Sequence, residues 1–121
     1  MNSETRSHRD LVVWQRSLDF VESIYRITNN FPPDERFGLT SQLRRAAVSI
    51  PSNISEGAAR ASAKEFAHFV SIALGSATEV ETQLEIAVRL KFLSEADSPV
   101  PELLQVIRML IRLRQSLIEK Q

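Results

Sequence analysis

Apolar residues recur along most of this chain at spacings of three and four, which is the period of an amphipathic helix. Four of the five prolines fall in two short stretches, Pro32–Pro33 and Pro99–Pro101, and the turn near Ser62 supplies a third break. No stretch alternates apolar and polar residues as a strand would. The pattern therefore predicts an all-α protein with four helices, over about residues 10–28, 35–57, 63–92 and 100–119.

Capping signals indicate where the helices begin. Asp10 is predicted to be the N-cap of the first helix, and Ser62 with Glu65 matches a capping box at the start of the third. The second helix is expected to begin near Asp34 or at Leu39. The polar residues 1–9 are expected to form a flexible tail, which leaves residues 10–121 as the bundle domain.

The first and fourth helices carry more apolar surface than one side of a bundle requires. In the first helix two neighbouring stripes cover roughly half of the circumference, whereas a surface helix needs an arc of about 100° or slightly more. The excess indicates either a wide core or an oligomer interface. The residues are Trp14, Leu18, Val21, Tyr25, Val13, Phe20, Ile24 and Ile27 in the first helix, and Leu103, Leu104, Val106, Ile107, Leu110, Ile111, Leu113, Leu117 and Ile118 in the fourth.

A polar stripe flanks the apolar stripe of the second helix, where a neighbouring helix should pack. Its members are Gln42, Arg45, Ser49, Asn53, Glu56 and Arg60. An antiparallel hairpin that turns near Ala61–Ser62 would pair this stripe with the third helix as Gln42–Gln83, Arg45–Glu79, Ser49–Ser76 and Glu56–His68. We predict a partly buried polar ladder that fixes the register of the two helices.

Three residues raise a question about the shape of these helices. Pro51 lies inside the second helix, where proline costs roughly 3 kcal/mol, and is interpreted as a bend rather than an end. Gly57 is the predicted end of that helix. Gly75, followed by serine and alanine, is expected to give the third helix a narrow waist that a partner backbone can approach.

Composition narrows the class of protein. Lys and Arg together number 15, as do Asp and Glu, so the net charge is zero. The overall charge therefore gives no indication of a nucleic-acid partner. There is no cysteine, the first nine residues do not resemble a secretory signal, and no stretch is apolar enough to span a membrane. We expect a cytoplasmic protein with no membrane partner.

Catalytic chemistry finds little support in the sequence. His8 and His68 are isolated, and Glu79, Glu81 and Glu85 have no accompanying histidine, so neither a metal nor another cofactor is expected. The cluster Ser49, Asn53 and Glu56 could carry acid–base chemistry in principle, but packing polarity is the favoured interpretation. We therefore predict that the protein is not an enzyme.

Four sequence blocks resemble the 23S rRNA intervening-sequence family of four-helix-bundle proteins. These are DLVVWQRS (10–17), NNFPPDERFGL (29–39), LTSQLRRAAVSIPSNISEG (39–57) and KEFAHFVSIALGSATEVETQLEIAVRL (64–90). The resemblance implies an antiparallel up-and-down four-helix bundle whose subunits form a homo-oligomeric ring, commonly a pentamer. It also implies no established catalytic activity, and a related accessory protein of diversity-generating retroelements binds nucleic acid.

Local clusters of cations give nucleic-acid binding a physical basis despite the zero net charge. Candidate contacts are Arg44, Arg108, Arg112, Arg114 and Lys120. Alternatively these side chains lie along the bundle surface or pair with acids of the third helix. We predict a homo-oligomeric assembly or adaptor module whose partner is RNA, DNA or a nucleic-acid-processing protein. The competing hypothesis is a small-ligand-binding or enzymatic module in which the polar stripe opens into a pocket.

Overall fold

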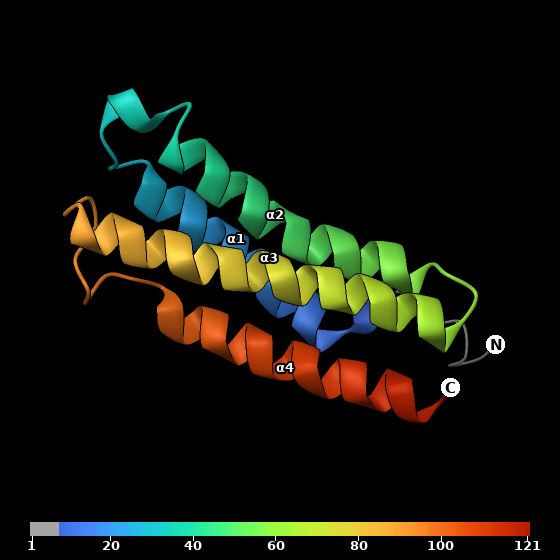
Figure 1. Cartoon of the computed structure of the whole chain (residues 1–121). Coiled ribbons are helices and arrows are strands. Elements are labelled where there is room, and N and C mark those ends of the chain that lie inside the picture. Colours follow the sequence, from blue (N-terminus) through green and yellow to red (C-terminus); the bar gives the residue numbers. More distant parts are fainter. Residues whose placement is uncertain (1–7) are drawn as a thin grey trace.

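The computed structural model describes residues 8–121, which form an antiparallel up-and-down bundle of four α-helices (Figure 1). The helices are α1 (Val12–Thr28), α2 (Leu39–Ala58), α3 (Ala63–Arg89) and α4 (Val100–Glu119), with short 3₁₀ helices at His8–Asp10 and Pro33–Glu35. The predicted fold class is confirmed. In the part of the chain described here, no helix is long and apolar enough to cross a membrane.

The helices pack in chain order around the bundle. The α2–α3 interface is the most extensive, α3–α4 and α1–α2 are intermediate, and α1–α4 is the smallest (Figure 1). Across the small interface, the Ser23 hydroxyl of α1 donates to the Glu102 carboxylate of α4 at 3.0 Å. The α1/α2 side of the bundle therefore lies opposite its α3/α4 side.

One apolar core runs the length of the bundle between all four helices. Full burial of a large aliphatic or aromatic side chain stabilises a fold by about 1.5–3 kcal/mol. The largest fully buried apolar side chains are Phe20, Ile24, Leu43, Ile50, Ile54, Leu84, Leu103 and Leu110.

The start of α1 differs from the prediction. The N-cap residue is Leu11, with no side-chain cap, so the assignment of Asp10 as the cap is wrong. Asp10 instead closes the 3₁₀ helix His8–Asp10, and the His8 ring packs edge-on against Trp14 with centroids 4.9 Å apart. Residues 8 and 9 therefore have defined structure, and residues 1–7 of the predicted tail lie outside the described residues.

The second helix begins at Leu39, the later of the two predicted starts. The segment before it forms the 3₁₀ helix Pro33–Glu35, and the Glu35 carboxylate accepts a hydrogen bond from the Leu39 N–H at 3.0 Å. That carboxylate supplies the cap that Gly38 cannot. The turn leaves Phe37 outside the core with 90% of its surface exposed.

The third helix begins as predicted and ends earlier. The Glu65 N–H donates to the Ser62 hydroxyl at 3.1 Å, which is the expected capping bond. The helix ends at Arg89 rather than near 92, because Lys91 adopts a left-handed conformation with φ of 66°. The N–H groups of Lys91 and Phe92 then bond to the carbonyls of Val88 and Ala87, which is the Schellman arrangement.

The two helix glycines differ from the prediction in how closely another helix approaches them. The helix α2 ends at Ala58, one residue beyond the predicted end at Gly57. A Cβ atom at Gly57 would lie 2.7 Å from the Phe69 Cβ and 2.9 Å from a ring carbon of Phe66, so α3 approaches this glycine closely. A Cβ at Gly75 would meet nothing within 4 Å, so the predicted waist is wrong. The helix runs through the buried Pro51 without a break.

We predict opposite effects for Gly57→Ala and Gly75→Ala. The first should destabilise the fold by about 1–3 kcal/mol, because the new methyl group overlaps Phe66 and Phe69. The second should stabilise it by up to about 1 kcal/mol, because alanine favours a helix and meets open space. Urea unfolding followed by circular dichroism measures both, and equal effects of the two substitutions would contradict the close approach at Gly57.

Candidate functional site

The predicted polar stripe lines an open groove between α2 and α3. The groove has a volume of about 480 Å³ and is lined by Gln42, Arg45, Ala46, Ser49, Ser76 and Glu79. The antiparallel register thus brings five of the predicted ladder residues to one surface. Because Gln42, Arg45 and Glu79 are exposed, most of this stripe is in contact with water.

One polar pair crosses from α2 to α3. The hydroxyl oxygens of Ser49 and Ser76 lie 2.9 Å apart. The Asn53 amide donates to the Ser49 hydroxyl at 2.9 Å and to the Ser49 carbonyl at 2.8 Å. Since Ser49 accepts from Asn53, its own proton can be donated to Ser76. These three half-buried residues form a short hydrogen-bonded chain beside the core.

The predicted ion pair between Arg45 and Glu79 is not formed within residues 8–121. Arg45 instead donates to the Ser41 hydroxyl one turn earlier, at 3.2 Å. Both side chains line the same groove, so the register is compatible with a pair. An ion pair that is open to water contributes only about 0–1 kcal/mol, which does not offset the ordering of two long side chains.

The pair predicted between Gln42 and Gln83 is also not formed in the described structure. Gln42 is exposed, whereas Gln83 is only 5% exposed and its amide donates to Glu79 at 3.2 Å. The Gln83 carbonyl oxygen is buried without a hydrogen-bond partner in the structure of residues 8–121. The ladder is therefore confined to its central serines.

Glu56 lies at the end of the stripe and does not reach His68. It pairs with Arg60 at 2.8 Å, because a residue four positions along is within easier reach than one on another helix. The His68 ring packs edge-on against Phe69, with centroids 5.5 Å apart. Glu56 also makes no bond to Ser49 or Asn53 in the described part of the chain, so the three residues considered for acid–base chemistry do not form one cluster.

Arg44 is held against α1 rather than extended into water. Its guanidinium donates to the Thr28 hydroxyl at 2.9 Å and to the Asn29 side chain at 3.1 Å. It also lies over the Tyr25 ring, 4.4 Å from the centroid. The guanidinium is therefore held in place by contacts with α1 and the residue that follows it, and it has no carboxylate partner within residues 8–121.

The other four candidate cations lie on α4. Arg108, Arg112 and Lys120 are exposed, and Arg114 is half-buried with its guanidinium 3.4 Å from the Ser71 hydroxyl of α3. Within residues 8–121, no ion pair joins any of the four to a carboxylate. The alternative that they pair with acids of α3 is therefore wrong.

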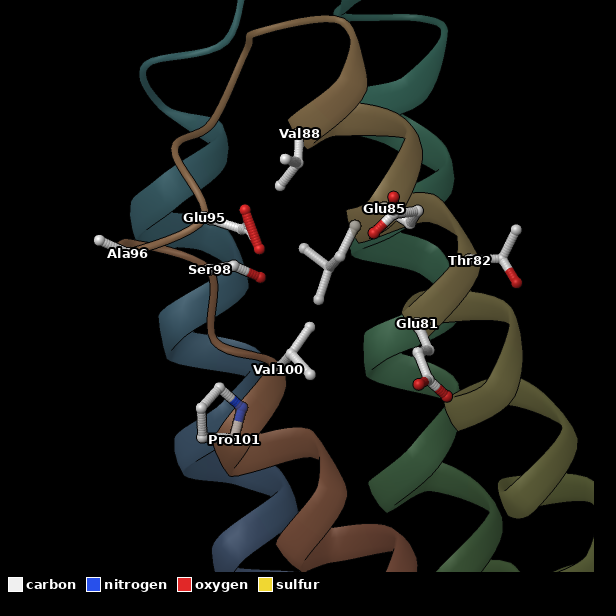
Figure 2. A pocket seen from close by; sticks show the side chains of 10 residues that line it. Glu81, Thr82, Glu85, Val88, Glu95, Ala96, Ser98, Val100 and Pro101 are labelled. Atoms are coloured by element: carbon white, nitrogen blue, oxygen red, sulfur yellow. The ribbon is translucent and has the colours of Figure 1, made fainter.

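Two further surface features were not singled out by the sequence patterns. One is a groove of about 420 Å³ lined by Tyr25, Arg36, Phe37, Thr40, Ser41, Arg44, Arg45 and Val48. The other is a pocket of about 560 Å³ lined by Glu81, Thr82, Leu84, Glu85, Val88, Glu95, Ala96, Ser98, Val100 and Pro101 (Figure 2). In the sequence, these features are marked only by an aromatic residue in a turn and by glutamates four positions apart on α3. Both patterns are common on protein surfaces, so neither indicates a site by itself.

Comparison with known proteins identifies a family and finds solved structures with a similar fold. The family model described as 23S rRNA-intervening sequence protein matches residues 9–112. A protein of unknown function from the S23 ribosomal protein family of Bacteroides thetaiotaomicron has a similar crystal structure, with a TM-score of 0.62 and 26% sequence identity. The match covers 89% of this chain and 96% of that one. No curated protein matches the chain.

The structure predicts that the serine pair, and not the groove cations, couples α2 to α3. In a double-mutant cycle, Ser49→Ala and Ser76→Ala should show a coupling energy of about 0.5–1 kcal/mol. The matched cycle of Arg45→Ala and Glu79→Ala should show about zero. Both are read from chemical unfolding, and a larger coupling for the charged pair than for the serines would contradict this assignment.

Proposed function

The chain belongs to the 23S rRNA-intervening sequence protein family, and from this premise we propose that it is a non-enzymatic, homo-oligomeric assembly module that binds nucleic acid or a nucleic-acid-processing protein. The family name refers to ribosomal RNA, and the solved relative is described as a protein of unknown function from the S23 ribosomal protein family. Neither name states what this chain binds, so its partner class is inferred from the residues on its own surface.

The observation that carries assembly is a stripe of exposed apolar side chains along α4. Leu104, Ile111 and Ile118 are 37%, 47% and 48% exposed and follow one another at intervals of seven residues. That interval places them on one face of the helix, as in the seam of a coiled coil. Exposed apolar side chains that line up in this way favour contact with another protein surface over contact with water.

The polar groups of the α2–α3 groove support a scaffold rather than a catalyst. Ser49 and Asn53 already bond to each other and to Ser76, and Glu56 is paired with Arg60. Among the described residues, no group of three or more His, Asp or Glu side chains is placed to hold a metal ion. The competing small-ligand or enzymatic module would have to use a groove whose central side chains already have partners.

The unpaired cations support nucleic acid as the partner class. Arg108 and Arg112 are exposed one turn apart on α4, where both can contact phosphates. The chain has no net charge, so a single subunit offers only a local patch. A ring, with a pentamer as the expected form, would repeat that patch and increase the total affinity through multivalency. The absence of cysteines fits a reducing compartment, and we expect the module to act in the cytoplasm.

Sedimentation velocity of the whole chain, alone and with a fluorescent RNA hairpin or DNA duplex, tests both parts of the proposal. Alone, the chain should sediment as a defined oligomer well above the 13.7 kDa subunit mass. The nucleic acid should co-sediment at about 50 mM salt and dissociate toward about 200 mM, because phosphate contacts release counterions.

The variant Arg112→Gln with Lys120→Gln provides the matched control, because both positions lie away from the stripe formed by Leu104, Ile111 and Ile118. It should weaken nucleic-acid binding and leave the mass of the protein unchanged, since both side chains are exposed and unpaired in residues 8–121. A monomer at every concentration would refute assembly. Absence of salt-sensitive binding at low salt would refute the nucleic-acid part alone.

A further inference from the structure

We propose that the subunits join head to tail, with Arg36 and Phe37 on the α1/α2 side of one copy entering the acidic pocket on the α3/α4 side of the next. This inference rests on the proposed homo-oligomer and specifies its contact. It follows from the charge, shape and position of two features that the fold itself does not require.

The first feature is a projecting aromatic residue on a basic surface. Phe37 is 90% exposed, and the Arg36 guanidinium lies over its ring at 5.5 Å from the centroid. The adjoining groove between α1 and α2 contains three arginines and no acidic residue in its lining. Phenylalanine and arginine are both enriched at protein–protein interfaces relative to the rest of the surface.

The basic surface is held rigidly before any partner arrives. Arg44 is fixed by Thr28, Asn29 and Tyr25, as described above, and the Glu35 carboxylate fixes the turn that presents Phe37 by capping α2. Little conformational freedom is lost when such a surface docks, which favours binding.

The second feature is the pocket between α3 and the connection that leads to α4. Glu95 and Ser98 reach from this connection toward α3, and Glu85 and Val88 face them from the helix (Figure 2). The lining contains three glutamates and no basic residue, together with apolar side chains that include Leu84, Val88, Val100 and Pro101. Only Glu85 has an ion-pair partner within residues 8–121, the exposed Arg89 at 2.9 Å.

These two features complement each other in charge and in chemistry. The apolar wall of the pocket can receive the Phe37 ring, while the glutamates can receive the Arg36 guanidinium. The Ser98 hydroxyl is buried there and has no hydrogen-bond partner in the described structure. The pocket wall therefore contains a polar group whose hydrogen bonds are not satisfied. A volume of about 560 Å³ is in the range that holds several side-chain groups.

Their positions in the bundle favour a closed ring. The α1/α2 and α3/α4 sides lie opposite each other, so a contact between them is heterologous and leaves a free site at each end of a pair. Both features also lie at the same end of the bundle, where the α1–α2 and α3–α4 connections lie (Figure 1). There the rings of Phe31 and Phe92, one from each connection, have centroids 5.7 Å apart. Successive subunits would therefore rise little along the helix axes, which favours closure over an open filament.

Exposed apolar side chains extend each surface along the bundle. On the α1/α2 side, Leu18 lies two turns before Tyr25 on the same face of α1. On the α3/α4 side, Ile111 and Ile118 flank Arg114, which reaches Ser71 of α3. The same two sides thus carry both the charged features and the apolar side chains that are exposed to solvent in a single subunit.

The test uses two variants of the full chain, each of which disables one surface. Arg36→Ser with Phe37→Ser removes the projecting pair, and Glu81→Lys with Glu95→Lys makes the pocket basic. Asp19→Lys with Glu56→Lys is the control, since it makes the same charge change at exposed positions away from both features and from the Leu18–Tyr25 face of α1. All of these side chains are exposed, and circular dichroism verifies that each variant is folded.

Each surface variant should assemble only at a concentration about tenfold or more above that of the wild type. The control should assemble at the same concentration as the wild type. An equimolar mixture of the two surface variants should form dimers that contain one copy of each and grow no further, because only one complementary contact remains. Such one-to-one dimers would not arise from a symmetric interface.

A wild-type oligomer whose mass is unchanged in both surface variants would overturn this inference while leaving assembly intact. A monomeric wild type would overturn the proposed assembly itself. If Arg36→Ser with Phe37→Ser keeps its mass and loses affinity for single-stranded RNA, the basic groove binds nucleic acid instead and the docking proposal is wrong.

Discussion

The close approach of α2 and α3 at Gly57 is the constraint on which the rest of the bundle depends. At this point α2 has no side chain, and the space is filled by Phe66 and Phe69 of α3. The two helices can then pack along most of their length, which sets the register that brings Ser49 within 2.9 Å of Ser76. With this pair fixed, α1 packs mainly on α2 and α4 mainly on α3, and the interface between α1 and α4 stays small. Interior packing of this kind tolerates little extra volume.

Surface chemistry follows from that arrangement. Because α1 and α4 pack mainly on α2 and α3, respectively, each retains apolar residues that the core does not cover. The connections at one end of the bundle then present a basic aromatic turn on one side and an acidic pocket on the other. The α2–α3 groove, by contrast, has central polar groups that already bond to each other. The basic groove and the acidic pocket, whose polar side chains are less fully hydrogen-bonded, therefore lie on the two outer sides of the bundle.

Much of the fold could be predicted from the sequence, because apolar period and capping residues are local signals. The helix count, the Ser62–Glu65 cap and the Ser49–Ser76 pairing all follow from spacing alone. Residue spacing does not reveal whether a position is exposed to solvent. The Arg45–Glu79 pair was therefore predicted, but it is not formed within residues 8–121. The close approach was likewise predicted at Gly75 and lies at Gly57, since a glycine does not reveal which side chains lie opposite it. Phe37 carried no periodic signal, because it lies in a turn.

Disulfide trapping tests the head-to-tail account most directly, since the chain has no cysteine of its own. In a variant with both Phe37→Cys and Val88→Cys, oxidation should link subunits into covalent multimers, and either substitution alone should give no covalent product. Geometry makes this stringent, because a disulfide requires Cα atoms within about 7 Å of each other. Covalent dimers from Phe37→Cys alone would indicate a symmetric interface and contradict the account, as would a double variant that assembles without forming any covalent link.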